Sequence, residues 1–257
     1  MENRFRCLKH RDEKEVNTET MKPPIYEPKG KAKEYGDLAL NIYTGCPHRC
    51  YYCFAPSVLH KDRESFHSHV EPRPGIIEET RKQLEREKIT GKLIHLCFTC
   101  DPYPTGCDST ATREIIKLLK EYGNHVQILT KGDGSRDFDL LDENDWYGIT
   151  YDGSEDETND PEHGKYPQDL RLVDVYSAKQ CLIKTWCSFE PVLNAGKVLE
   201  CLKSCHRFFD KVKIGKLNYH KSDIDWREFG LAAAEICIEY GLDYYIKDSL
   251  RAEMERG

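Results

Sequence analysis

The sequence predicts an α/β protein that folds as a partial (β/α)6 barrel. Two observations support this fold class. Short apolar runs of strand character alternate along the chain with longer runs of helical periodicity, which is typical of parallel sheets. One face of each expected strand also carries polar side chains, and unpaired buried polar groups cost about 1–3 kcal/mol each. The barrel interior should therefore hold a polar ligand; a flatter sheet with one solvated face is the alternative.

Six strands are expected, at residues 38–43, 93–99, 125–131, 146–151, 182–189 and 211–216. Because side chains alternate along a strand, residues two apart share a face. The polar faces carry Asn41, Tyr43, His95, Thr99, Asp101, Gln127, Lys131, Thr150, Lys184, Ser188, Glu190 and Lys213.

Four helices are expected between the strands, at residues 76–88, 110–122, 195–205 and 222–240. The second should stop at Gly123, a residue type favoured just past a helix end. Asn194 should cap the third helix, and Ser222 should open the fourth.

These elements form one domain at residues 37–247, after a polar N-terminal arm at 1–36 and before a C-terminal tail at 248–257. The acidic segment 152–163 should be a solvated loop or lid. The net charge of −7 argues against a broad grip on nucleic acid but leaves room for a local basic groove. No run approaches the about 20 apolar residues of a membrane span, and the N-terminus has no apolar signal region. We therefore expect a cytoplasmic protein without a membrane partner.

Twelve cysteines are many for 257 residues, and in a reducing compartment they indicate metal binding, chemistry or core packing. Cys46, Cys50 and Cys53 follow the first strand with the spacing Cys-x3-Cys-x2-Cys. Three thiolates in one loop suit an iron–sulfur cluster or zinc. A four-iron cluster would keep one iron open for chemistry. The alternatives are core thiols, or a non-catalytic zinc module completed by His48 or His60.

This motif, with an aromatic residue before its last cysteine, resembles the radical S-adenosylmethionine (radical SAM) superfamily. The resemblance implies a 4Fe–4S cluster whose fourth iron binds S-adenosylmethionine, and a 5′-deoxyadenosyl radical that abstracts hydrogen from a substrate. It also implies a full or partial (β/α) barrel of the radical SAM type. A reducing partner such as flavodoxin or ferredoxin is expected.

A closer resemblance covers residues 41–46, 50–55, 99–104 and 129–131, which are similar to the DNA-repair-photolyase-like group related to spore photoproduct lyase. It implies that Tyr52 and Phe54 lie near the adenine of the cofactor. Cys100 and Asp101 should lie at the cofactor-facing turn. Lys131 should pair with the methionine carboxylate.

The same resemblance implies that Thr150 approaches the ribose, and Ser188 is expected to join the cofactor contacts. Cys97, Cys100, Tyr103 and Glu190 are expected to handle the substrate or take part in catalysis. Phe98 stands where this group has its hydrogen-donating cysteine, so Cys97 or Cys100 would have to donate instead.

This departure means that thymine-dimer repair is not implied. The substrate is expected to be a nucleic-acid lesion, cleaved by a carbon–carbon lyase reaction, or else a protein or small molecule. If nucleic acid binds, Arg49, Lys61 and Arg63 beside the cysteine loop are candidates for a basic groove.

The remaining cysteines are expected to pack in the core or, for three of them, to form a second site. Helical spacing predicts core packing for Cys201 and Cys205, and strand parity predicts it for Cys181 and Cys187. An auxiliary cluster is the alternative reading of Cys97, Cys100 and Cys107.

Overall fold

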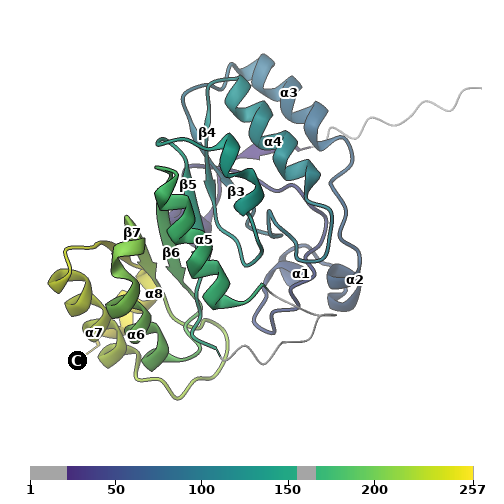
Figure 1. Ribbon diagram of the computed structural model, residues 1–257. Coiled ribbons are helices and arrows are strands. Elements are labelled where there is room, and N and C mark those ends of the chain that lie inside the picture. The colour runs from purple at the N-terminus through teal and green to yellow at the C-terminus, as the bar shows by residue number, and fades with distance from the viewer. Residues whose placement is uncertain (1–21, 155–165, 257) are drawn as a thin grey trace, which may run out of the picture.

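The computed structural model describes residues 22–154 and 166–256 (Figure 1). A single sheet runs in the order β1 to β8, in which β1 is antiparallel to β2 and every later neighbour is parallel. The strands are β1 (Ile25–Tyr26), β2 (Leu38–Leu40), β3 (Leu93–Leu96), β4 (His125–Ile128), β5 (Trp146–Thr150), β6 (Lys184–Phe189), β7 (Lys211–Ile214) and β8 (Asp243–Ile246).

The predicted fold class is confirmed, because the unclosed parallel sheet with its crossover helices is a partial barrel. All six expected strands are present as β2 to β7, each shorter than predicted. Strand β8 was missed, so the count of six parallel strands is wrong by one. Its four residues carry only one fully buried side chain, Ile246, which leaves little apolar pattern to recognise.

The helices are α1 (Ala55–Val58), α2 (Arg63–Ser68), α3 (Ile76–Glu87), α4 (Thr110–Glu121), α5 (Gln168–Gln180), α6 (Ala195–Cys205), α7 (Trp226–Glu239) and α8 (Asp248–Met254). Three short 3₁₀ helices accompany them: η1 (Gly30–Glu34), η2 (Ser135–Leu140) and η3 (His206–Phe208). Figure 1 shows α3 and α4 side by side toward one end of the sheet, with α6, α7 and α8 grouped toward the other. No described helix is long and apolar enough to cross a membrane.

All four expected helices are present, and α5 was not anticipated. The Asn194 cap is confirmed, since its side-chain oxygen accepts from the Lys197 amide at 3.1 Å. The start of the fourth helix was placed too early. Helix α7 begins after Asp225, whose carboxylate accepts from the Glu228 amide at 2.9 Å, and Ser222 lies outside it.

The apolar core lies between the strands and the helices that cover them. Its members are fully or almost fully buried and include Ile94, Leu96, Val126, Ile128, Val212 and Ile214. The opposite strand faces are polar, as expected, but much of this polarity is satisfied inside the protein. The Gln127 amide donates to His95 Nδ1 at 3.0 Å, and burial together with the Lys213 ammonium lowers the pKa of His95 to about 3. This imidazole is therefore a neutral acceptor.

The segment that leads into β2 contacts the far edge of the sheet at β8. The Glu34 carboxylate accepts from the Tyr245 hydroxyl at 3.3 Å and from the Asp248 amide at 3.0 Å. Tyr35 follows, and its ring centroid lies 6.0 Å from that of Trp186 on β6. Residues 22–36, expected to be an arm, thus supply β1 and η1, and the expected tail contains α8. Most of the acidic segment 152–163 falls outside the described residues.

Candidate active site

The three predicted metal-binding cysteines lie in the loop after β2, and helix α2 holds this loop in place. The His67 ring lies 2.7 Å from the Cys46 carbonyl. The Arg63 guanidinium donates to the Cys53 carbonyl at 3.2 Å and also to the Cys50 carbonyl. These bonds fix the backbone of all three cysteines, whose thiols are free of disulfides.

Gly45 allows the loop to approach α2 closely. A Cβ atom at this position would lie 2.3 Å from the Phe66 carbonyl oxygen and 2.4 Å from that of His69, far inside van der Waals contact. The Cys46 amide, next in the chain, donates to the same Phe66 carbonyl at 3.2 Å. Only glycine fits between β2 and α2 without displacing the first cysteine.

Two of the three loop thiols, those of Cys46 and Cys53, resist ionisation. Burial, followed by the Asp101 carboxylate, raises the pKa of Cys46 well above its ordinary value. Burial also raises the pKa of Cys53, and the nearby Lys131 ammonium opposes that rise. Metal binding requires the thiolate, so occupation of this loop must release protons.

The spread of the sulfur atoms bears on which metal centre fits. In a tetrahedral zinc site the Zn–S distance of about 2.3 Å puts sulfurs about 3.8 Å apart. Within residues 22–154 and 166–256, only one group of three His, Cys, Asp or Glu ligands converges within 4.8 Å, and it contains no cysteine. The three loop sulfurs therefore do not all lie within 4.8 Å of one another, as ligands of a single zinc ion would.

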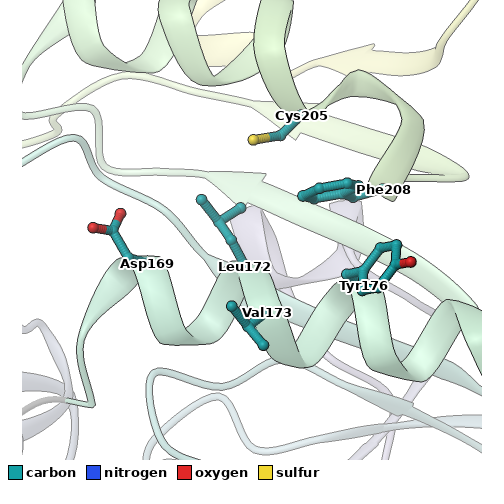
Figure 2. Close-up of a pocket in the computed structure, with 6 residues that line it drawn as sticks. All are labelled: Asp169, Leu172, Val173, Tyr176, Cys205 and Phe208. Atoms are coloured by element: carbon teal, nitrogen blue, oxygen red, sulfur yellow. The ribbon is translucent and has the colours of Figure 1, made fainter.

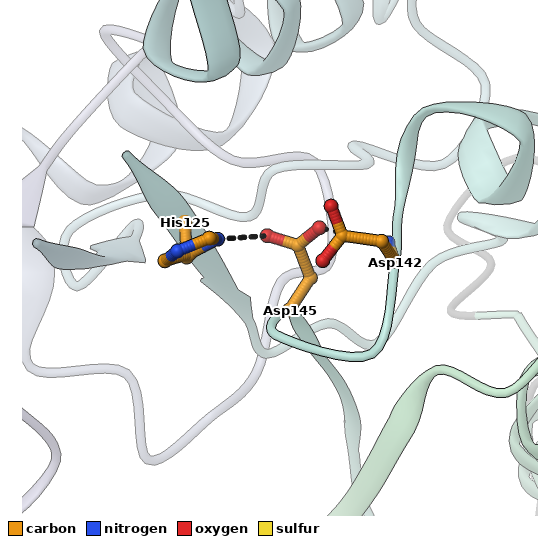
Figure 3. Close-up of side chains that lie close together, drawn as sticks. All are labelled: His125, Asp142 and Asp145. Carbon is orange, nitrogen blue, oxygen red and sulfur yellow. Dashed lines mark hydrogen bonds and ion pairs between the residues drawn. The ribbon is translucent and has the colours of Figure 1, made fainter. Parts of the chain in front are cut away.

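That one converging group is His125, Asp142 and Asp145, at the start of β4 (Figure 3). The Lys120 ammonium already pairs with both of its carboxylates, lying 2.7 Å from Asp142 and 2.5 Å from Asp145. A lysine thus provides the positive charge that a metal would otherwise supply, and these residues form a structural ion pair.

Asp101 joins the turn after β3 to the end of β4. One carboxylate oxygen accepts from the Tyr103 amide at 2.9 Å and from the Thr130 hydroxyl. The other accepts from the Lys131 amide at 2.8 Å. Asp101 therefore orients the backbone that carries Lys131, and most of its acceptor capacity is used within the protein.

His48 connects the cysteine loop to the same carboxylate. Its Nε2 accepts from the Thr105 amide at 3.2 Å, so the proton of a neutral ring lies on Nδ1. Nδ1 lies 3.4 Å from the Asp101 carboxylate. Both nitrogens are thus engaged, and His48 is not a zinc ligand in this arrangement. The sequence pattern suggested only a zinc-ligand role for His48 and gave no sign of this positioning role.

Lys131 and Tyr52 lie beside the cysteines. The Lys131 ammonium is 5.7 Å from the centroid of the Tyr52 ring, and the Tyr52 hydroxyl donates to Asp152 at 3.0 Å. Because the ammonium also acts on the Cys53 thiol, it can receive an anionic group of a ligand bound at that thiol. Phe54, at the start of α1, is half exposed.

Cys97 and Cys100 lie in the turn after β3, and each thiol shifts the pKa of the other. Burial and the bond to Cys100 raise the pKa of Cys97 well above its ordinary value. Burial opposes ionisation of Cys100, but the bonds from Cys97 and from the Tyr43 amide outweigh it and lower the pKa of Cys100. Cys97 also adopts φ +75°, a left-handed conformation that is costly for a residue with a side chain. The one tight group of candidate metal ligands in the described residues contains none of Cys97, Cys100 and Cys107.

Ser188 and Glu190 are brought together at the end of β6 by Tyr35. The Tyr35 hydroxyl donates to Glu190 at 2.9 Å and lies 3.1 Å from the Ser188 hydroxyl. Lys247 also donates to Glu190, and the Asn218 amide donates to it at 3.1 Å. Sequence patterns did not indicate Tyr35 or Lys247, because their partner Glu190 is distant from both of them in the chain.

Thr150 and Tyr103 are both buried. Thr150 pairs with Ser188 across β5 and β6, and its carbonyl accepts from Arg171. The Tyr103 hydroxyl donates to Asp137 on η2 at 3.2 Å. This bond turns Tyr103 toward the η2 side and gives no support to a substrate contact.

The three basic residues considered for a groove beside the cysteine loop, Arg49, Lys61 and Arg63, each have a partner within the protein. Arg49 makes a bidentate pair with Glu64 at 2.6 and 2.7 Å. Arg63 is bound to the loop carbonyls, and the Lys61 ammonium donates to the Thr44 carbonyl at 2.8 Å. All three cations hold the loop and α2 together.

The four cysteines that were expected to pack in the core lie at the end of α5, on β6 and on α6. Cys187 and Cys201 are buried, as predicted, but Cys181 caps α5 and is exposed, because β6 starts at Lys184, two residues later than expected. Cys205 is half-buried and lines an apolar hollow between α5 and η3 (Figure 2). None of the predicted site residues lines this hollow.

The comparisons with known proteins agree with the fold and the loop. Among curated proteins, no sequence matches this chain. The structure of spore photoproduct lyase complexed with dinucleoside spore photoproduct is similar at 13% identity and a TM-score of 0.64, over 85% of this chain and 78% of that one. SuiB from Streptococcus suis bound to precursor peptide SuiA is similar at 11% identity and a TM-score of 0.60, over 84% of this chain and 50% of SuiB.

SuiB bound to S-adenosylmethionine is also similar, with 10% identity and a TM-score of 0.57, over 84% of this chain and 49% of that one. At these identities the likeness concerns the fold. The family model of the radical SAM superfamily matches residues 40–208, which include the cysteine loop and strands β3 to β6. The chain therefore belongs to the radical SAM superfamily, whose enzymes use a 4Fe–4S cluster and S-adenosylmethionine.

Proposed function

We propose that Cys46, Cys50 and Cys53 hold the 4Fe–4S cluster and that the protein catalyses hydrogen abstraction from a substrate. When bound, the cluster supplies the electron that cleaves S-adenosylmethionine to a 5′-deoxyadenosyl radical. One observation carries the proposal: three free thiols lie in one loop after β2, and the Lys131 ammonium, from the segment after β4, lies 5.7 Å from the ring of Tyr52 in that loop.

The residues around the loop would bind and orient the cofactor. Lys131 pairs with the methionine carboxylate, as the family resemblance implies, and its ammonium lies 5.7 Å from the ring of Tyr52 in the cysteine loop. Tyr52 and Phe54 flank the adenine. Thr150 and Ser188, paired across the ends of β5 and β6, face the ribose. Asp101 acts through the backbone of Lys131 and is a positioning residue.

Cys97 and Cys100 are the proposed source of a returning hydrogen atom. Their bond leaves Cys97 as the protonated thiol and Cys100 as the more acidic one. Glu190 would act from the opposite wall, where three side chains fix its carboxylate.

The substrate we favour is a nucleic-acid lesion, cleaved in a carbon–carbon lyase reaction. The structural likeness to spore photoproduct lyase bound to a dinucleoside supports this class. A peptide is the second candidate, because SuiB, which is similar over the same share of this chain, is bound to one. We place the enzyme in the cytoplasm, with flavodoxin or ferredoxin as the reductant.

Anaerobic reconstitution with iron and sulfide tests the chemistry. After reduction with dithionite, the wild-type protein should form 5′-deoxyadenosine from S-adenosylmethionine. Cys46→Ala should abolish this product, whereas Cys205→Ala, which removes a thiol from a distant helix, should retain it. Equal loss in both variants would overturn the assignment of the loop cysteines.

A further inference from the structure

The loop between β7 and α7 presents an exposed tip on a fixed base. At the base, Leu217 is buried and the Asn218 amide donates to Glu190 at 3.1 Å. At the tip, Tyr219 is 86% exposed, although it is one of the largest apolar side chains of the protein. The base is part of the barrel wall, so the tip is held in a defined place.

Tyr219 also adopts a strained backbone conformation. Its φ is +65°, in the left-handed region that is unusual for a bulky residue. Such strain is normally offset by packing, but this ring lies in solvent with the Lys31 ammonium 4.9 Å from its centroid. Residues held in such conformations are found at ligand-binding sites, among other places.

The tip reaches the cysteine loop through aromatic contacts. The His220 ring lies 5.3 Å from the Tyr51 ring, edge to face, and Tyr51 lies 5.1 Å from Tyr52 in the same manner. Tyr51 is 56% exposed. A row of rings thus leads from the exposed tip to Tyr52, which lies beside Lys131.

Positive charge accompanies these rings. The Lys31 ammonium donates to the Asn218 side chain at 2.7 Å, which brings η1 to the loop. Lys29 and Lys33 are exposed on the same short segment, and exposed Lys221 follows His220. Lys31 and Lys221 thus place an ammonium group next to the exposed rings of Tyr219 and His220.

We propose that Tyr51, Tyr219 and His220 form a stacking rim for the unpaired bases of a single nucleic-acid strand, with Lys31 and Lys221 contacting its phosphates. Rings with ammonium groups beside them match the bases and phosphates of one strand, and base stacking tolerates any sequence. An acidic protein can make a few phosphate contacts, whereas an extended interface with the phosphates of a duplex needs many more basic residues. The inference deepens the proposed nucleic-acid substrate and rests on it.

The test is fluorescence anisotropy of a labelled single-stranded oligothymidylate of about 12 nucleotides with the reconstituted protein. Tyr219→Ala should weaken binding by about fivefold or more, and Tyr219→Phe should retain it. Lys31→Ala should reduce the slope of log affinity against log salt by about 0.7. Tyr176→Ala, which removes a half-exposed ring on α5, is the matched control and should bind as the wild type does.

No binding at about 50 mM salt, equal binding by Tyr219→Ala and the wild type, or preference for the matching duplex would overturn the rim. A tyrosine-containing peptide that displaces the oligonucleotide would also overturn it, in favour of a peptide substrate. Formation of 5′-deoxyadenosine by the wild type without substrate is measured in parallel. If that product forms and the oligonucleotide does not bind, the rim fails while the radical chemistry stands. If the oligonucleotide binds and no product forms, the radical chemistry fails while the rim stands.

Discussion

His48 and Asp101 lie 3.4 Å apart, Nδ1 to carboxylate oxygen, and this contact ties the cysteine loop to the ends of β3 and β4. The same carboxylate accepts from the Lys131 amide. The position of the cation relative to the three cysteines is therefore set by one buried aspartate, through two short connections.

Asp101→Asn should disturb this arrangement, although the new side chain has nearly the same size as the old one. An amide nitrogen in place of one oxygen would face a backbone N–H donor and leave a buried group unpaired, which costs about 1–3 kcal/mol. We expect a lower urea midpoint and weaker S-adenosylmethionine binding. Asp108→Asn, an exposed carboxylate on the following loop, is the control. An unchanged midpoint and affinity would show that Asp101 does not connect the loops.

Lys131→Met tests the cation itself. A charge-assisted hydrogen bond is worth about 1.5–3 kcal/mol, so affinity for S-adenosylmethionine should fall about ten- to a hundredfold. Iron content should stay normal, because the ammonium binds no metal. Calorimetry of the reconstituted protein measures the affinity, and Lys184→Met, at the exposed start of β6, should leave it unchanged. An affinity equal to that of the wild type would remove Lys131 from the cofactor site.

Gly45→Ala should damage the cysteine loop specifically. Its Cβ would lie 2.3 Å from a carbonyl of α2, so the loop or the helix must move. Iron bound per chain after reconstitution should drop sharply. Gly196→Ala is a matched control, because the nearest atom to its Cβ is at 3.5 Å, an ordinary contact. Full iron content in Gly45→Ala would mean that the loop has more freedom than its hydrogen bonds indicate.

Local patterns predicted the parts of this protein that depend on neighbours in the chain. The alternating strands, the Asn194 cap and the three cysteines are of this kind, since each is defined within a few residues. Tyr35 and His48 could not be assigned in the same way. The partners of Tyr35, Ser188 and Glu190, are more than 150 positions away, and Thr105, which fixes the His48 tautomer, is 57 positions away. Their roles follow from the topology alone.

The residues considered for a basic groove show the same limit of prediction from local sequence. Arg49, Lys61 and Arg63 are close in sequence to the cysteines, and nothing local distinguishes a free cation from a bound one. The structure gives each of them a carboxylate or carbonyl partner supplied by the loop or α2.

Asp174 on α5 provides a pH-dependent prediction. Burial, reinforced by Asp133, raises its pKa to about 7, and its Oδ2 has no hydrogen-bond partner. The unfolded chain has an ordinary aspartate, with a pKa near 3.9. Between pH 4 and pH 7 the folded state therefore holds one more proton than the unfolded state at this site, so its contribution to stability falls as pH rises through that window.

Asp174→Asn removes this titration and should stabilise the protein above pH 7. Relief of a buried, unpaired carboxylate is worth about 1 kcal/mol or more, or about 2–4 °C in Tm per kcal/mol for a chain of this size. Thermal unfolding of both proteins at pH 5 and pH 8 gives the comparison, because other titrations cancel in the difference. The Tm advantage of the variant should be larger at pH 8. Asp169→Asn, on the exposed face of the same helix, should show no such pH dependence. A gain that is equal at both pH values would mean that Asp174 is already ionised in the folded protein at pH 5.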